Sequence, residues 1–188
     1  WLTSLIVPVM AATDGDFENR LRAAESAGDR NAVATICQEW YASGQYSPGL
    51  LNWNYNALMS VEQNALLFTL QGSDTYPAML LQNALNVRPD VCLISFEFIE
   101  AQEYRKLLID REGFNWIPVE GSLHDFVSNM LMPKSTQAAQ TRPVYFGSMV
   151  NKNLMEVDKG KLYLTGLALK FSPEAFDNVA TLRYNFEI

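Results

Sequence analysis

Six small or polar residues, at the ends of two apolar segments, are the best candidates in the sequence for binding or chemistry. They are Gly72, Ser73, Asp74, Thr75, Ser95 and Glu97. The first four form a turn after residues 65–70, and the last two stand near the end of residues 91–98. In open parallel sheets, ligands bind beyond the carboxyl ends of the strands, so we predict a ligand site here. No residue is assigned a catalytic role.

The turn offers two kinds of chemistry. Free N–H groups at the start of a following helix would attract a negatively charged group, whereas Asp74 or Thr75 would cap that helix instead. With Ser95 and Glu97 in the same crevice, Asp74 would make an acid–base site for a small enzyme. The turn lacks the glycine spacing and the Gly-Lys-Ser/Thr sequence of nucleotide sites, so we expect no cofactor.

Metal chemistry is not expected either. His124 is the only histidine and has no cysteine near it in the sequence, which favours a surface or capping position. The neighbouring carboxylates Glu97 and Glu100, or Asp14 and Asp16, are typical of a solvated surface in a chain with 21 acidic residues. The sequence therefore predicts no metal site.

The composition is that of a globular chain of 188 residues, of which 48% are hydrophobic and 19% charged. Its formal charge is −7 and no cluster of Lys and Arg interrupts the acidic balance, so we expect no nucleic-acid partner. Cys37 and Cys92 lie on a predicted helix face and in a predicted strand. These positions favour buried free thiols, with a disulfide as the alternative, and they leave the compartment open.

A strand–helix–strand unit would position the candidate site. Residues 65–70 predict a buried strand, Pro77 begins a helix with a repeating apolar face, and residues 91–98 predict a second strand. Two strands joined by one helix pair in parallel. We therefore predict an α/β fold, with a mostly parallel sheet and flanking helices in a Rossmann-like three-layer arrangement.

Helices precede this unit. A first apolar stripe consists of Phe17, Leu21 and Ala24. A second helix, capped by Asp29 or Asn31, completes a helical hairpin that ends at Gly44. The third helix begins at Ser47-Pro48 and places on one face Leu51, Tyr55 and Leu58. We predict one domain over residues 13–188, with a helical part over 13–60 and a sheet-containing core over 61–188.

Further elements follow the second strand. We predict a helix over residues 101–111, a short strand over 114–119 and a helix after a capping box formed by Ser122 and Asp125. Strands are predicted over 143–149 and 162–171, the last one bent at Gly166. The tail over residues 175–188 has no decisive period.

Residues 1–12 are strongly apolar and run directly into an acidic stretch. As a helix they would reach about halfway across a bilayer, where roughly 20 residues are needed. Three interpretations stay open: the remnant of a membrane anchor, the end of a signal peptide, or a segment of the core.

Several motifs occur together in a fixed order. They are Asn64-Ala65-Leu66-Leu67-Phe68-Thr69, Asp74-Thr75-Tyr76-Pro77, Val87-Arg88-Pro89-Asp90-Val91 and Arg142-Pro143-Val144-Tyr145-Phe146. In this order they resemble the extracytoplasmic carboxyl-terminal region of the protein O-mannosyltransferase-like multi-pass membrane family, in its bacterial branch. The resemblance implies a periplasmic or cell-envelope location and kinship with membrane glycosyltransferases.

The chain departs from this family in two ways. The family's turn has two acidic positions, one of which is Gly72 here, so a site that needs both carboxylates does not carry over. The family's sugar transfer is assigned to its membrane-embedded half, and these 188 residues contain no multi-pass segment. The resemblance therefore does not imply that this chain transfers mannose by itself.

Three functional hypotheses follow. The first is a non-catalytic extracytoplasmic accessory domain that binds a protein partner or a glycan, with Trp40, Trp53 or Trp116 as contacts and the helical hairpin as a docking surface. The second is a small enzyme with a carboxylate site at residues 72–75. The third is an assembly subunit of a membrane complex, attached through residues 1–12. A concave pocket that joins Asp74, Ser95 and Glu97 would favour the enzyme.

Overall fold

A parallel pair of strands lies at the centre of the fold. The computed structural model describes residues 14–114, 117–131, 142–155 and 159–186. Strand β1 (Leu66–Thr69) pairs in parallel with β2 (Cys92–Ser95), and helix α4 (Tyr76–Leu85) connects them. Pro77 lies in the first turn of α4, where its missing N–H costs no hydrogen bond. The predicted strand–helix–strand unit and its parallel pairing are confirmed.

The fold is mixed α/β, with an open five-stranded sheet in the order β2-β1-β3-β5-β4. Strand β3 (Val144–Gly147) pairs in parallel with β1, on the side opposite β2. Strand β5 (Ala168–Phe171) is antiparallel to β3, and β4 (Leu162–Leu164) is antiparallel to β5. The sheet is therefore mixed rather than mostly parallel.

The antiparallel half arises from a hairpin where we predicted one bent strand over 162–171. Gly166 has a φ of +144°, a conformation that is strained for other residues, and the chain reverses there. Leu162 consequently lies opposite Phe171. The prediction of a single strand was wrong because Gly166 forms a turn instead of a bulge.

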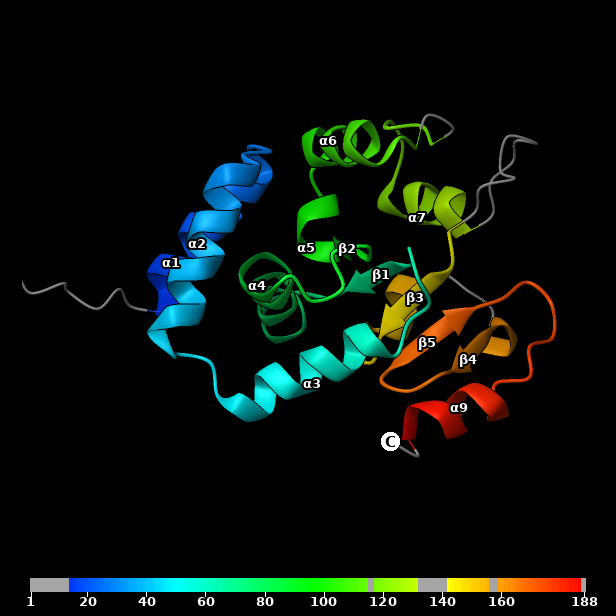
Figure 1. The fold of residues 1–188 in the computed structure, drawn as a ribbon. Coiled ribbons are helices and arrows are strands. Elements are labelled where there is room, and N and C mark those ends of the chain that lie inside the picture. The colour runs from blue at the N-terminus through cyan, green and yellow to red at the C-terminus, as the bar shows by residue number, and fades with distance from the viewer. Residues whose placement is uncertain (1–13, 115–116, 132–141, 156–158, 187–188) are drawn as a thin grey trace, which may run out of the picture.

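Helices cover both faces of the sheet (Figure 1). On one face, Leu67 and Tyr145 pack with residues of α3 (Pro48–Met59) and α4. On the other, Phe68 and Phe146 stack with their ring centroids 5.0 Å apart and belong to a core with α5 (Phe96–Ile99), α6 (Gln102–Glu112) and α7 (Leu123–Leu131). The alternation of side chains along β1 and β3 thus fills two separate cores.

The predicted helical hairpin is confirmed as α1 (Asp14–Ser26) and α2 (Arg30–Ser43). The Asp29 carboxylate accepts the N–H of Ala32, and Gly44 ends α2 with a φ of 69°. The hairpin packs through α2 against α4, at the β2 side of the sheet (Figure 1). Cys37 of α2 and Cys92 of β2 are buried free thiols, as predicted.

Other predicted elements differ in part. Strand β2 ends at Ser95, because residues 96–99 coil into α5 and thereby bury three of their four side chains. Of the strand predicted over 114–119, the described residues 114 and 117–119 are not in a strand. The Ser122–Asp125 capping box is present at the start of α7. The undecided tail contains α9 (Val179–Phe186), after the short segments α8 (Lys152–Met155) and η3 (Lys159–Lys161).

The predicted apolar segment over residues 1–12 and Trp116 lie outside the described residues. Among the helices in the described part of the chain, none combines the length and the apolar character needed to cross a membrane.

Candidate functional site

The predicted turn is a short helical segment, η1 (Gly72–Asp74), that is closed by its own carboxylate. Asp74 accepts the N–H of Leu70 on Oδ2 at 2.9 Å and the N–H of Gln71 on Oδ1 at 3.1 Å. Burial raises the pKa of the Asp74 carboxyl above its ordinary value, while these N–H groups act in the opposite direction. Asp74 therefore stabilises the turn between β1 and α4.

Buried hydroxyl groups lie next to this carboxylate. The Thr75 hydroxyl donates to that of Thr69 at 2.8 Å and lies 3.5 Å from both Asp74 Oδ1 and Ser95 Oγ. Ser95 in turn donates to the carbonyl of Leu70 at 3.1 Å. The structure thus brings Asp74, Thr75 and Ser95 together as the sequence predicted.

The remaining predicted residues have other surroundings. Gly72 adopts a φ of +57° within the turn, and the carbonyl of Ser73 accepts a hydrogen bond from Asn54 Nδ2 of α3 at 2.9 Å. Glu97 lies in α5, where it pairs with Arg22 Nε at 2.7 Å and accepts the Tyr76 hydroxyl at 2.9 Å. Its side chain therefore belongs to a cluster with the helical hairpin.

The order of the strands locates the edge of the sheet where ligands of such folds bind. Because β1 connects to β2 on one side and pairs with β3 on the other, the switch in strand order lies between β1 and β3. A depression of about 10 Å³ lies there, which we call the strand-end depression. Its lining includes Trp53, Asn54, Thr69, Asp74, Gly147 and Met149. Sequence reasoning missed the residues after β3, because the pairing of β3 with β1 is not visible in a local pattern.

A much larger groove, of about 810 Å³, runs between α3 and α9, and we call it the aromatic groove. Five of the eleven large hydrophobic side chains that the described residues expose line it: Trp53, Tyr55, Met59, Tyr184 and Phe186. The polar residues of its lining include Asn56, Ser60 and Asn185. Large exposed apolar patches of this kind mark binding surfaces.

Tyr55 illustrates why the sequence did not predict this groove. The spacing placed Tyr55 on the inner face of α3, but its residue is 42% exposed. Asn54 is buried in its place, because its side chain donates to the carbonyls of Leu50 and Ser73. Because Asn54 is polar, the apolar spacing did not identify it as part of the inner face of the helix. The aromatic residues on either side of Asn54 were the available signal for the groove.

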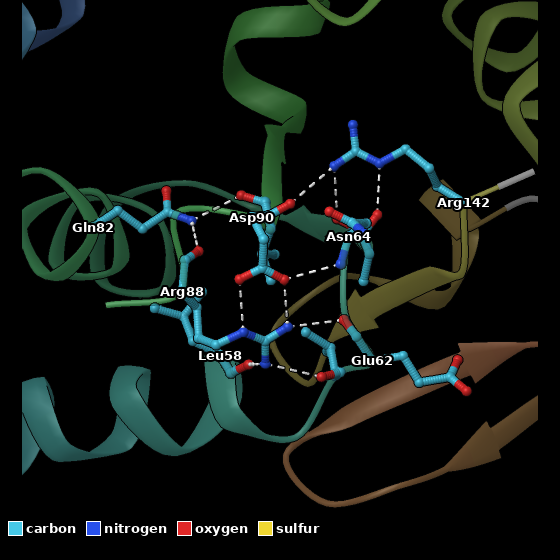
Figure 2. A network of polar contacts seen from close by, with 10 residues as sticks. Leu58, Glu62, Asn64, Gln82, Arg88, Asp90 and Arg142 are labelled. Carbon is cyan, nitrogen blue, oxygen red and sulfur yellow. Dashed lines mark hydrogen bonds and ion pairs between the residues drawn. The ribbon is translucent and has the colours of Figure 1, made fainter. Parts of the chain in front are cut away.

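One charged side chain, Arg88, is among the described residues that line the groove, and its donors are bound inside the protein. Arg88 forms two hydrogen bonds of 2.9 Å to the Asp90 carboxylate. Its remaining hydrogen bonds, between 2.8 and 3.0 Å, go to the carbonyls of Leu58, Val61 and Glu62. Figure 2 shows these contacts at the amino ends of β1 and β2. The groove itself therefore presents neutral chemistry.

A third, polar cleft of about 110 Å³ lies beside β2. Several of its polar residues bind one another: Tyr104 and Arg111 both donate to Glu25, and Arg111 and Arg142 both donate to Glu112. Burial raises the pKa of the Cys92 thiol to about 12, so this thiol stays protonated. Within the described residues, no cluster of His, Cys, Asp and Glu is suited to a metal ion. Most of the charged groups of this cleft are thus engaged in bonds that join α1, α6 and the start of the sheet.

Comparison of the chain with family models, with curated proteins and with solved structures gave no significant match.

Proposed function

We propose that this chain is a non-catalytic binding domain whose aromatic groove holds a neutral glycan. The observation that carries the proposal is the groove itself: about 810 Å³ lined by exposed aromatic rings and by amide and hydroxyl side chains. A protein interior would normally bury such rings, so their collection in one concavity supports a binding role.

The chemistry of the lining supports a sugar. Sugar rings carry C–H groups on their faces, which pack against the electron-rich faces of Trp and Tyr, while their hydroxyls bond to amides and hydroxyls at the rim. Trp53, Tyr55 and Tyr184 supply the rings. Asn56, which follows Tyr55 on α3, supplies an amide in the same lining. The chain has a formal charge of −7, yet no carboxylate is among the described residues of the lining. A neutral ligand matches this distribution.

The bonds around the candidate carboxylates support a non-catalytic role. Asp74 closes its own turn, and Glu97 accepts Arg22 and Tyr76. Burial raises the pKa of Tyr76, so its hydroxyl remains a donor to Glu97. Two alternatives to the binding domain are a small enzyme with a carboxylate site at residues 72–75 and an assembly subunit of a membrane complex.

The proposal includes a location and a kinship. Residues 142–146 and the ordered motifs before them resemble the membrane glycosyltransferase-like family, which supports an extracytoplasmic accessory domain, with membrane attachment through residues 1–12. A Rossmann-like relationship belongs to the same proposal, and the parallel β1–α4–β2 unit supports it. A glycan ligand would suit a domain with this origin, and a protein partner is the alternative ligand.

Calorimetric titration with neutral linear oligomers of mannose, glucose and N-acetylglucosamine tests the proposal. We expect the wild-type chain to bind at least one series, and Trp53→Ala to weaken that binding about tenfold or more, because a central aromatic contact is lost. Tyr41→Ala is the matched control, since Tyr41 is 36% exposed on α2, outside the groove.

Two results would overturn the proposal. One is an absence of binding to every series by the wild-type chain. The other is binding of an amphipathic helical peptide, but of no sugar, with loss of that binding in Trp53→Ala, which would identify the groove as a protein-docking site.

A further inference from the structure

The aromatic groove and the strand-end depression are neighbours in the fold. Trp53 and Leu167 line both of them. Along α3, the groove extends from Ser60 to Trp53, a helical rise of about 10 Å, which exceeds the width of a single sugar ring. A ligand that fills the groove toward Trp53 therefore arrives at the carboxyl ends of β1 and β3.

The size of the depression limits what can enter it. A volume of about 10 Å³ accommodates one water-sized group. A sugar ring is too large for this space, but a single hydroxyl group fits. The depression is consequently suited to one substituent of a ligand whose ring stays outside.

Asp74 supplies the chemistry of the depression. Its residue is 8% exposed, and each of its carboxylate oxygens accepts one backbone N–H. The Thr75 hydroxyl also lies 3.5 Å from Oδ1, so the remaining capacity to accept a hydrogen bond is on Oδ2, which takes the N–H of Leu70. A buried acceptor at the bottom of a hydroxyl-sized space favours a donor that enters from outside.

Gly147 keeps this space open. A Cβ atom at position 147 would lie 3.7 Å from Asp74 Oδ2 and 3.3 Å from the carbonyl oxygen of Phe68. Any side chain there would occupy the approach to the carboxylate. At the rim, Met149 is 53% exposed and offers apolar contact to a ring that lies over the depression.

We infer that the bound glycan is an elongated chain that continues past Trp53 and inserts one hydroxyl group into the strand-end depression, where it donates to Asp74. This inference rests on the proposed function and adds the length of the ligand and a second recognition point. Longer oligomers bind more tightly than short ones, because only they reach from α9 across Trp53 to Met149.

The test compares oligomers of increasing length from the series that the wild-type chain binds. We expect Gly147→Ala to reduce the affinity for long oligomers about tenfold and to leave that for short oligomers unchanged. Gly49→Ala is the matched control, because a Cβ at position 49 meets no atom within 4 Å. Circular dichroism of each variant reports whether it folds.

A second variant keeps the inference testable if Gly147→Ala does not fold. Met149→Ala removes an exposed side chain. We expect it to reduce the affinity for long oligomers about threefold and to leave the affinity for short oligomers unchanged. If wild-type affinity is independent of length, or if both variants bind long oligomers normally while Trp53→Ala does not, the inference is wrong and the proposed function stands. If the wild-type chain binds no oligomer, both are wrong.

Discussion

The amino ends of the central strands and the aromatic groove meet at Arg88, yet they use their side chains in opposite ways. At the strand ends, Arg88, Asp90 and Arg142 bond to one another's backbones or side chains and to carbonyls of the preceding loops (Figure 2). In the groove, large rings such as Tyr184, which is 74% exposed, face solvent. The charged side chains at the strand ends hold the fold together, whereas the neutral rings of the groove stay exposed.

This difference indicates where substitutions should act. Arg88 has a φ of 44°, an unfavourable conformation for a residue with a side chain, which its five hydrogen bonds compensate. The aromatic rings of the groove have no comparable set of bonds within the described residues. Changes at the strand ends should therefore affect stability, and changes in the groove should affect binding.

The largest expected effect is the loss of stability caused by Arg88→Ala. The substitution removes two of the hydrogen bonds of Asp90 and the Arg88 donor of three backbone carbonyls, so we expect the free energy of unfolding to fall by about 3 kcal/mol. Urea denaturation measures this change. Arg20→Ala is the control, since Arg20 pairs with Glu39 at the surface and such pairs contribute about 0–1 kcal/mol. Equal losses in the two variants would contradict the contrast between the two regions.

An intermediate effect is expected from pH. The Arg88 guanidinium lowers the pKa of Asp90 from 3.8 to about 2, so ionised Asp90 stabilises the fold above pH 3.8 and this contribution is lost as the pH falls toward 2. In Asp90→Asn the denaturation midpoint should therefore vary less with pH over this interval.

Asp74 gives the opposite sign and serves as the comparison. Its pKa is raised, so its protonated form favours folding, and that contribution is lost as the pH rises through the folded-state pKa.

For Asp90→Asn, a pH profile of stability equal to that of the wild-type chain would show that the pairing of Asp90 with Arg88 does not stabilise the fold.

The smallest effect concerns salt. Because the groove presents neutral chemistry, its affinity for an oligosaccharide should change less than about twofold between about 50 mM and about 500 mM NaCl. Titration calorimetry at several salt concentrations measures this. A steep dependence on salt would mean that Arg88 or charged residues outside the lining contribute to binding.

Sequence reasoning predicted those elements that local spacing defines. The caps at Asp29, Ser47 and Ser122 each depend on residues within one helical turn, and all three are present. The β1–α4–β2 unit is also local in sequence. Pairing of β3 with the far side of β1 depends on residues about 80 positions apart, which no short pattern reports.

The candidate site divides in the same way. Asp74, Thr75 and Ser95 were predicted because they follow recognisable strands. Tyr184 and Phe186 were not, because α9 buries none of its residues and therefore has no apolar stripe for a pattern to detect. A helix whose side chains stay exposed lacks the periodicity on which the prediction of helices depends.

The turn at Gly166 has a consequence for the kinetics of binding. It approaches α3 so closely that a Cβ there would lie 2.8 Å from Ser60 Cβ, and Ser60 Oγ accepts the N–H of Leu167 at 3.1 Å. Asn185 of α9 donates to the carbonyl of Thr165 on the other side of the same turn. These bonds link both walls of the groove to one turn. For the proposed glycan we therefore expect association to require little rearrangement, so that dissociation rates account for most differences in affinity among ligands.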